Sequence, residues 1–309
     1  MSDFGSQTTT DEVLEGVDLS GRRVLITGAA VGLGRETARA MAAHGAEVTI
    51  LARSAERADE GAAAVEALVP GAGVDTGVVD LGSLASVNAF ADGWLADHDA
   101  VDVLINNAGV IRWAGFPEAD AENLAAHLDV HLWGSFHTTR AAWPTMVEQG
   151  FGRVVMTTSS GVFGLPQNLG YAAAKGGVIG LARSLATAGA KRGIKVNCIA
   201  PAASTRMAGG GGGPDPALMD PALVAPLAAY LAHEDCPVTG VIYCAGAGRF
   251  ARLFLASTPG WVAGGEGDEP TLEDVAAHWE AINAEEGYTV PADLVAWSRT
   301  FLDHLPPPG

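Results

Sequence analysis

Short apolar runs alternate with longer Ala- and Leu-rich segments from residue 22 onward. The apolar runs are four to six residues long and rich in β-branched residues, which is typical of strands buried on both faces. The longer segments have the length of helices. Such alternation predicts a parallel sheet covered by helices on both sides. The expected strands are Arg23–Thr27, Glu47–Leu51, Val74–Val79, Val101–Asn106, Arg153–Thr157, Lys195–Ile199 and Val241–Cys244.

Six helices are expected between these strands. They are Leu33–His44, Ala55–Leu68, Leu84–Asp97, Ala121–Val147, Ala172–Lys191 and Pro221–His233. The sequence therefore predicts an α/β fold: a single doubly wound, Rossmann-type domain over residues 19–249, with a seven-stranded parallel sheet. An N-terminal arm, residues 1–18, precedes this domain. A helical C-terminal extension, residues 250–309, follows it and is expected to pack on the same domain or at a subunit interface.

Two regions interrupt the alternation. Gly209–Gly213 is a run of five glycines, which no core element would tolerate, so it predicts a mobile surface segment. The extension carries two helical patterns, Thr271–Ala284 and Ala292–His304. Thr271 followed three residues later by Asp274 resembles a capping box, so the first of these helices is expected to begin there.

The charge balance excludes several classes of partner. The chain has 18 Lys and Arg against 36 Asp and Glu, and its net charge of −18 argues against nucleic acid, whose phosphates require clustered basic residues. No apolar run is long enough to span a bilayer and the N-terminus has no signal-peptide pattern, so we expect a cytoplasmic protein without a membrane partner. No metal site is expected. Cys198, Cys236 and Cys244 form no CxxC pair and are expected to be reduced core residues.

A glycine-rich loop follows the first strand. Strand Arg23–Thr27 runs into Gly28-Ala-Ala-Val-Gly32-Leu33-Gly34 and then into a helix. Glycines at such a turn let the backbone approach a pyrophosphate, whose charge is stabilised by the helix N-terminus. The loop therefore predicts a dinucleotide site, with the spacing Gly-x-x-x-Gly-x-Gly in place of Gly-x-Gly-x-x-Gly.

Four motifs resemble those of the short-chain dehydrogenase/reductase family, in the family's order, over Leu19 to Ala247. They are Thr27-Gly-x-x-x-Gly-x-Gly, Asp80-Leu81, Asn106-Asn-Ala-Gly109 and Tyr171-x-x-x-Lys175. The resemblance implies an NAD(P)-dependent oxidoreductase acting on CH–OH groups. It also implies a set of cofactor contacts. These are Asp80 and Leu81 at the adenine, Asn107, Ala108 and Gly109 along the cofactor, and Pro201 and Thr205 over the nicotinamide.

The end of the second strand bears on the choice of cofactor. A carboxylate there binds the 2′-hydroxyl of NAD, whereas an arginine pairs with the 2′-phosphate of NADP. The strand ends Ala52-Arg53, with Ala52 at the place where NAD-using relatives carry Asp. NADP(H) is therefore the expected cofactor, bound by Arg53. NAD(H) is the alternative, with Arg53 a solvated residue before the next helix.

Tyr171 and Lys175 are four residues apart at the start of an Ala-rich helix and therefore share one face. A tyrosine titrates near 10, so acting as a base near neutrality requires a pKa shift of roughly three units, on the order of 4 kcal/mol. A nearby ammonium and the oxidised nicotinamide can supply it. In the family this tyrosine exchanges the alcohol proton while hydride moves to or from the nicotinamide, and the resemblance implies that Tyr171 and Lys175 do the same.

Two hydroxyls compete for the place beside the substrate oxygen. Thr158 stands thirteen residues before Tyr171, which is the family's usual spacing, whereas counting from the start of the fifth strand selects Ser159. We favour the strand count, because a shift of one residue turns a side chain to the other face of a sheet, while loops absorb deletions. Ser159 is the expected residue and Thr158 the alternative.

One position departs from the family pattern. The usual asparagine in the helix before the fifth strand is replaced by His131, within Leu128-Asp-Val-His-Leu-Trp-Gly134. A histidine also passes protons, because its pKa lies near neutrality. Two roles are open for His131: a proton relay beside Tyr171, or packing of the helix without a chemical role.

Two branches of the family contribute local resemblances. Val130–Phe136 and Ile199–Met207 resemble the (3R)-hydroxyacyl-CoA dehydrogenase domain of the β-oxidation multifunctional enzyme, also called a 17-beta-hydroxysteroid dehydrogenase. Residues 10–21 and 80–87 are more similar to retinol-dehydrogenase-type reductases that use NADP(H). The expected activity is interconversion of a secondary alcohol and a ketone by an NADP(H)-preferring enzyme. The alternatives are an NAD-dependent (3R)-hydroxyacyl-CoA dehydrogenase and a catalytically silent cofactor-binding sensor or scaffold.

Segments outside the sheet are expected to select the substrate. Their apolar content predicts a hydrophobic small molecule. The apolar residues are Phe163, Leu165, Met207, Leu218, Phe250, Phe254 and Trp261.

The helix that follows Tyr171 contains Gly176, Gly177 and Gly180, each of which costs about 1 kcal/mol in an isolated helix. Close packing against another surface would compensate, and in the family this helix and the one over 121–147 carry the usual dimer contact. A homodimer or homotetramer is therefore expected.

Overall fold

The computed structural model describes residues 10–203, 216–263 and 269–305. Gly209–Gly213, Thr205 and Met207, which were given roles above, lie outside these ranges. The chain divides into two compact units, residues 1–252 and 253–309, and each is described by itself. Among the described residues, no helix combines the length and the apolar character needed to cross a bilayer.

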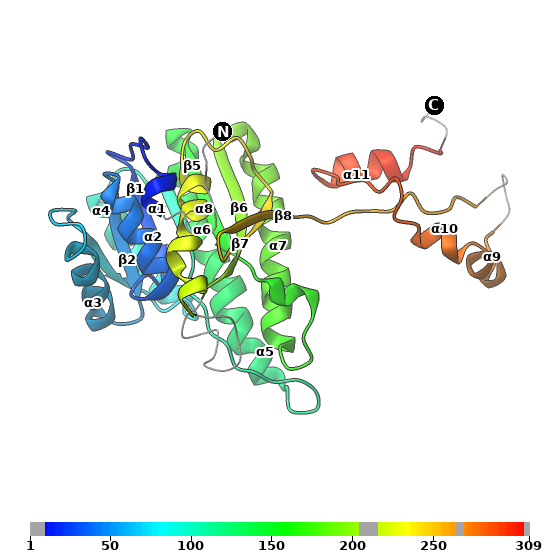
Figure 1. Ribbon diagram of the computed structural model, residues 1–309, viewed down its shortest axis with the longest axis horizontal. Coiled ribbons are helices and arrows are strands. Elements are labelled where there is room, and N and C mark those ends of the chain that lie inside the picture. Colours follow the sequence, from blue (N-terminus) through cyan, green and yellow to red (C-terminus); the bar gives the residue numbers. More distant parts are fainter. Residues whose placement is uncertain (1–9, 204–215, 264–268, 306–309) are drawn as a thin grey trace. The chain divides into compact units, whose positions relative to one another are not determined.

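The first unit is built on one sheet with the strand order β3-β2-β1-β4-β5-β6-β7-β8 (Figure 1). All neighbouring pairs from β3 to β7 are parallel, which confirms the doubly wound α/β fold. The strands are β1 Arg23–Thr27, β2 Glu47–Ala52, β3 Asp75–Val78, β4 Val103–Asn106, β5 Gly152–Thr157, β6 Ile194–Ala202, β7 Ile242–Gly246 and β8 Arg249–Leu253.

The seven expected strands form the parallel part of the sheet. An eighth strand that was not expected, β8, turns back along β7 as an antiparallel hairpin. The two residues between them, Ala247 and Gly248, have φ values of 49° and 69°. Two positive φ angles are the geometry of the tight hairpin turn that matches strand twist. Ala-Gly is not one of the usual sequences for this turn, so the hairpin could not be predicted from the turn residues.

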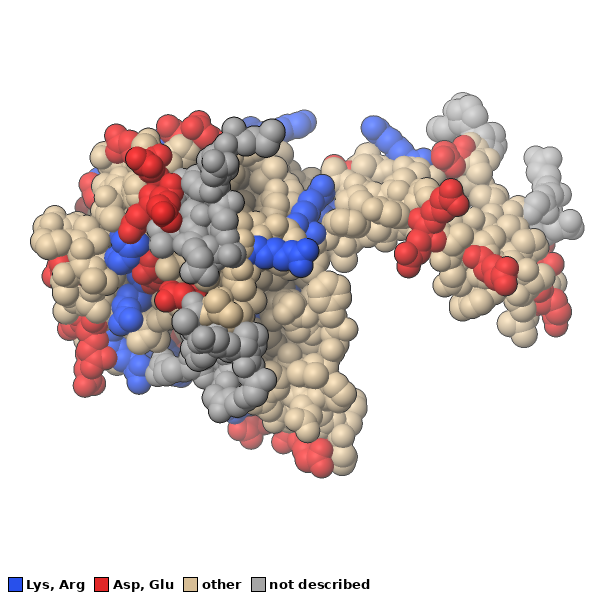
Figure 2. Space-filling view, in the orientation of Figure 1, with Lys and Arg blue, Asp and Glu red and all other residues tan. Residues whose placement is uncertain are grey.

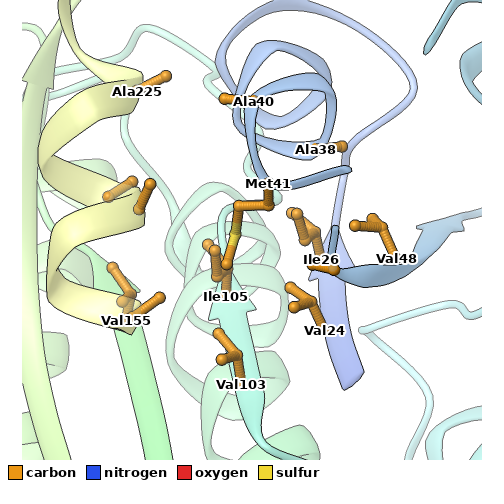
Figure 3. Packing of buried hydrophobic residues seen from close by; sticks show 14 of the residues in the cluster. Val24, Ile26, Ala38, Ala40, Met41, Val48, Val103, Ile105, Val155 and Ala225 are labelled. Atoms are coloured by element: carbon orange, nitrogen blue, oxygen red, sulfur yellow. The ribbon is translucent and has the colours of Figure 1, made fainter. Parts of the chain in front are cut away.

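Helices cover both faces of this sheet. Val24 and Ile26 of β1 point to one face, where they pack with Met41 of α2, and α2 lies beside α8 (Figure 3). Leu25, between them, points to the other face, toward α4 and α6, because successive strand side chains alternate. The helices of this unit are α1 Thr10–Val13, α2 Gly32–Ala43, α3 Ala55–Glu66, α4 Leu84–Asp97, α5 Ala121–His127, α6 Gly134–Gln149, α7 Leu169–Gly189 and α8 Ala225–Ala232.

The single helix expected over Ala121–Val147 is interrupted. A π-helical turn, Leu128–Trp133, separates α5 from α6. The Ser135 hydroxyl donates to the His131 carbonyl at 2.7 Å, and the Thr138 hydroxyl donates to the Gly134 carbonyl at 2.8 Å. Hydroxyls that bind carbonyls one turn back compete with the regular backbone ladder, and π turns are frequent at functional sites. His131 lies within this interruption.

The described part of the N-terminal arm reaches into the hydrophobic core. Leu14, just after α1, is 1% exposed and belongs to the main hydrophobic core.

Cys198 and Cys236 are buried as expected, whereas Cys244 is only half-buried; all three are free thiols. The helix expected over Pro221–His233 begins with a short 3₁₀ turn and becomes α8 only at Ala225.

The second unit contains α9 Leu272–Ala277, α10 Trp279–Asn283 and α11 Leu294–Phe301. The capping box at Thr271 and Asp274 is confirmed, but the helix expected over Thr271–Ala284 breaks at His278, whose ring stacks on Trp261 at 4.1 Å. Within residues 253–263 and 269–305, no residue is buried. Several large apolar side chains are therefore exposed within this unit, among them Leu272, Trp279, Leu294 and Phe301.

Candidate active site

The predicted site residues gather at the carboxyl ends of β1, β4, β5 and β6. The strand order reverses between β1 and β4, and ligands of doubly wound sheets bind where this reversal occurs. The loop after β1 carries Gly28–Gly34, and the loop after β4 carries Asn107–Gly109. Tyr171 and Lys175 lie in the first turns of α7.

Glycines allow the first two of these loops to touch. Gly28 has φ +67°, and a Cβ there would lie 2.7 Å from the Cα of Ala108. At Gly34, a Cβ would collide with the side-chain amide of Asn107 and lie 2.8 Å from the Gly28 carbonyl oxygen. Side chains at either position would force the loops apart, so the first and last glycines of the pattern Gly-x-x-x-Gly-x-Gly are packing requirements here.

Thr27 joins the same two loops by hydrogen bonds. Its hydroxyl oxygen accepts from the backbone N–H of Asn107 at 3.0 Å and of Ala108 at 3.1 Å. In return the Asn107 side-chain amide donates to the carbonyls of Thr27 and Gly28, at 3.1 and 3.2 Å. The loops after β1 and β4 are therefore fixed to each other.

These residues fit a dinucleotide cofactor. Val31 stands at the N-cap of the 12-residue helix α2 and offers no capping side chain, so the helix N-terminus is left for an anion. Leu33 and Leu81 are buried beneath this region. Arg53 is exposed directly after β2, and Asp80, also exposed, accepts from the Gly82 N–H at 3.1 Å. Pro201 lies near the end of β6.

Ser159, Tyr171 and Lys175 lie together. The Ser159 hydroxyl accepts from the Gly161 N–H at 3.0 Å, and it is close enough to Tyr171 to act on the pKa of that phenol. The Lys175 Nζ lies 5.6 Å from the centre of the Tyr171 ring and donates to the Thr157 carbonyl at 2.6 Å. Lys175 is only 2% exposed.

Thr158 is turned the other way. Its hydroxyl donates to the backbone carbonyl of Lys175 at 2.8 Å, and its side chain is buried. The two neighbouring hydroxyls therefore occupy different places: Ser159 lies on the side of Tyr171, and Thr158 ties β5 to α7.

Burial sets the protonation of the pair. It raises the pKa of Tyr171, while the neighbouring Ser159 hydroxyl lowers it to a lesser degree. Burial also lowers the pKa of Lys175 to about 7. In the protein without cofactor, Tyr171 is thus a neutral phenol near pH 7, and Lys175 titrates near neutrality.

His131 packs against this pair. Its ring meets the Tyr171 ring edge-on, with centroids 5.1 Å apart, and its Nε2 lies 2.8 Å from the Val110 carbonyl oxygen. The other ring nitrogen, Nδ1, is buried and has no hydrogen-bond partner among the described residues. Burial, and secondarily the charge of Lys175, lowers the pKa of His131 to about 3. His131 is therefore neutral near pH 7.

The lowered pKa of His131 predicts a stability difference in acid. Between pH 6.5 and 3 the unfolded chain binds a proton at this residue and the folded chain does not, so the free energy of unfolding falls as the pH is lowered. Replacing His131 with asparagine removes this loss, worth about 3 kcal/mol between pH 6.5 and 4. Urea unfolding across this range measures it. Parallel pH curves for the two proteins would show that His131 is not the cause.

Two groups of residues near the site were not predicted. His127 is fully buried and meets the Tyr171 ring edge-on at 6.0 Å. Asn123, His127 and His131 follow each other at intervals of four, and this spacing was the available signal. Trp113 and Phe116, in the loop after β4, are 51% and 79% exposed. Two exposed aromatic side chains so close in sequence were the signal for the second group.

Comparison with known proteins places the chain in a family. A family model described as short chain dehydrogenase matches residues 22–210, which include the glycine loop, Tyr171 and Lys175. The chain belongs to the short-chain dehydrogenase family. It is thus an NAD(P)-dependent oxidoreductase acting on CH–OH groups.

The relatives of this short-chain dehydrogenase include proteins of similar length and longer, multifunctional enzymes. The chain is 38% identical to the short-chain type dehydrogenase/reductase Rv0148 of Mycobacterium tuberculosis, over 86% of this chain and 95% of that protein. It is 36% identical to the peroxisomal multifunctional enzyme type 2 of Mus musculus, over 87% of this chain but only 38% of that protein. The chain therefore spans well under half the length of that multifunctional relative.

The similar solved structures also include a longer multifunctional enzyme and a shorter single enzyme. The full-length peroxisomal multifunctional enzyme type 2 of Drosophila melanogaster matches with a TM-score of 0.76 and 30% identity, covering 93% of this short-chain dehydrogenase and 50% of that chain. Levodione reductase matches with a TM-score of 0.68 and 30% identity, covering 74% of this chain and 98% of that one. Since residues 253–309 exceed the uncovered 7%, at least part of the second unit has a counterpart in the multifunctional enzyme.

Proposed function

We propose that this protein is an NADP(H)-preferring oxidoreductase that interconverts a secondary alcohol and a ketone on a hydrophobic small molecule. The observation that carries the proposal is the placement of Ser159 beside Tyr171 and buried Lys175, at the edge of the sheet that holds the glycine loop. Family membership supports the reaction class.

In this mechanism a nicotinamide, when bound, would supply or take up the hydride. Ser159 holds the substrate oxygen by a hydrogen bond, and the Tyr171 hydroxyl gives the ketone oxygen its proton. The raised pKa of Tyr171 suits this acid role, because the phenol is protonated at neutral pH. Lys175 stabilises the tyrosinate that forms. In the direction of alcohol oxidation, Tyr171 takes the proton back.

For His131 we propose support rather than proton relay. A pKa of about 3 makes the protonated ring costly at neutral pH, and efficient relay groups titrate near the working pH. Its contacts, to the Val110 backbone and the edge of the Tyr171 ring, are those of a residue that holds others in place.

The preference for NADP(H) rests on the end of β2. Ala52, its last residue, is buried and brings no carboxylate, whereas Arg53 is exposed. Ser54 caps α3 by accepting from the Arg57 N–H at 3.4 Å, so Arg53 stands beside a helix N-terminus. A 2′-phosphate would gain from both.

Titration of the purified protein with NADPH and NADH tests this preference. We expect tighter binding of NADPH, and a loss of about 10- to 100-fold in NADPH affinity in Arg53→Ala, because hydrogen bonds to charged groups are worth about 1.5–3 kcal/mol. NADH affinity should stay constant. Arg57→Ala, exposed in the first turn of α3, is the matched control. A preference for NADH that Arg53→Ala leaves intact contradicts the cofactor proposal.

Exposed apolar side chains support a hydrophobic substrate. Trp113, Phe116 and Phe163 are at least half exposed. Their loops are joined where Ala114 bridges to Asn168, and the Leu169 N–H donates to the Ala114 carbonyl at 3.4 Å. The surface next to α5 carries few charged side chains in Figure 2, apart from acidic ones at its tip. We propose that the apolar part of the substrate lies on these loops.

The similarity to peroxisomal multifunctional enzymes favours a second candidate, an NAD-dependent (3R)-hydroxyacyl-CoA dehydrogenase. The observation in its favour is the extent of the match. The multifunctional enzyme covers 93% of this chain, including part of the second unit, whereas levodione reductase covers 74%. Turnover of 3-hydroxyacyl thioesters with NAD, and none of simple ketones with NADPH, would select it. The surplus of acidic residues weighs against a ligand as rich in phosphate as coenzyme A.

We also propose a homodimer or homotetramer in the cytoplasm. A Cβ at Gly176 or Gly180 would meet nothing within 4 Å, whereas Gly177 packs against Leu132, so two of the three glycines leave an open face on α7. Free cysteines suit a reducing compartment. The extension over 250–309 is proposed to pack on the same domain or at a subunit interface, because its described part has no interior of its own.

A further inference from the structure

Three polar side chains at intervals of four bind the backbone of residues 110–112. The side-chain amide of Asn123 donates to the Arg112 carbonyl at 3.0 Å. The Arg112 N–H donates to Nε2 of His127 at 3.1 Å. His131 Nε2 lies 2.8 Å from the Val110 carbonyl oxygen and 3.3 Å from its nitrogen. One face of α5 and the π-helical turn therefore bind backbone groups of Val110 and Arg112, at the two ends of this segment.

The hydrogen bonds of His127 fix its tautomer. Because the Arg112 N–H is a donor, Nε2 of His127 must be the acceptor, and the ring proton is on Nδ1. Nδ1 lies 2.7 Å from the Asn123 carbonyl oxygen and donates to it. Each ring nitrogen thus binds a different element: Nδ1 binds α5 itself, and Nε2 binds the segment after β4. The side chain is 0% exposed, so water does not compete for either bond.

The same ring reaches the tyrosine. His127 and His131 stack with centroids 6.2 Å apart, and both meet the Tyr171 ring edge-on. Gly170, just before Tyr171, permits this approach, since a Cβ there would lie 2.9 Å from Nδ1 of His127 and 2.8 Å from Oδ1 of Asn123. His127 therefore contacts both the segment 110–112 and the ring of Tyr171.

We propose that His127 and Asn123 are positioning residues of the active site, which hold Val110–Arg112 and Tyr171 in fixed relation to each other. The segment begins immediately after the proposed cofactor contacts Asn107–Gly109 and ends before Trp113. Its displacement would shift the substrate relative to the Tyr171 hydroxyl. The inference rests on the proposed function, because it assigns Tyr171 the proton transfer. Neither residue touches the reacting atoms; each acts through what it holds.

A matched pair of substitutions separates the two bonds of His127. In His127→Gln the longer side chain places its amide oxygen near the position of Nε2 and accepts from the Arg112 N–H. In His127→Asn the shorter amide reaches only the carbonyl four residues back, as Asn283 does to Trp279 at 2.8 Å. Both variants remove the ring from the edge of Tyr171. They differ in whether the segment 110–112 remains bound.

The measurement is steady-state ketone reduction, with NADPH affinity and thermal unfolding alongside. We expect kcat to fall about 10- to 100-fold in His127→Asn, because displacements near 1 Å cost up to 10²-fold, while NADPH affinity stays within about threefold. His127→Gln should recover most of kcat. Asn123→Ala, which removes only the bond to the Arg112 carbonyl, should lower kcat less, by about threefold to tenfold.

Amide hydrogen exchange of residues 110–112 gives a readout that needs no turnover. Exchange should accelerate in His127→Asn and stay slow in His127→Gln. Equal losses of kcat in the two variants, or unfolding changes with kcat intact, overturn the positioning role. Tyr171→Phe serves as the reference. If that variant keeps full activity, the proposed function fails, whereas exchange still reports whether His127 holds the segment.

Discussion

Replacing Tyr171 with phenylalanine should lower kcat by about 10²–10⁴-fold, the usual contribution of a positioned acid or base. The substitution removes one oxygen and keeps the ring, whose edge-on contacts with His127 and His131 need no hydroxyl. The fold and the glycine loop should therefore be unaffected, and NADPH should bind as before. Ketone reduction at saturating NADPH, together with fluorescence titration of the cofactor, measures both.

This variant separates an enzyme from a cofactor-binding sensor. A sensor would bind NADPH equally well before and after the change and show no turnover in either form. Tyr230→Phe, on α8 and 43% exposed, is the matched control and should leave kcat unchanged. Full activity in Tyr171→Phe would remove the proposed mechanism altogether.

Replacing Ser159 with alanine should lower kcat by about 10²–10³-fold, as does loss of one hydrogen-bond donor to a developing oxyanion. Of the two hydroxyls, that of Ser159 is the one beside Tyr171, so its removal leaves the substrate oxygen without its second partner. KM for the ketone should rise less than kcat falls, because the bond strengthens in the transition state. Steady-state kinetics of both parameters provide the measurement.

Thr158→Val is the counterpart of this experiment. The buried Thr158 hydroxyl donates to the Lys175 carbonyl, so its loss should cost about 1–3 kcal/mol of stability and little activity. The thermal midpoint should fall while kcat stays close to that of the parent protein. If Thr158→Val instead removes activity and Ser159→Ala does not, the family spacing from Tyr171 selects the correct hydroxyl. Counting residues from the start of β5 then selects the wrong one.

Those parts of the site that lie within one element could be predicted from the sequence. Tyr171 and Lys175 share a face because helix geometry fixes four-residue neighbours. The glycine loop follows β1 because the strand and the next helix both have clear patterns. Ser159 and Thr158 could not be separated in this way, since the direction of each hydroxyl depends on the loop that follows β5.

Features that depend on contacts between elements could not be predicted. The π-helical turn between α5 and α6 accompanies hydroxyl–carbonyl bonds of Ser135 and Thr138, and a helical pattern does not reveal them. His127 gains its importance only when α7 approaches α5 at Gly170. The eighth strand depends on an Ala-Gly turn with two positive φ angles. Periodicity describes the faces of an element but not the neighbour that each face meets.

The bonds of Thr27 to Asn107 and Ala108 have a kinetic consequence. Because the loops after β1 and β4 are already fastened together, the proposed cofactor-binding surface does not have to assemble when the cofactor arrives. Binding to such a preformed surface loses little conformational entropy. Association should therefore be a single step whose rate rises linearly with cofactor concentration, limited by encounter rather than by a change of shape.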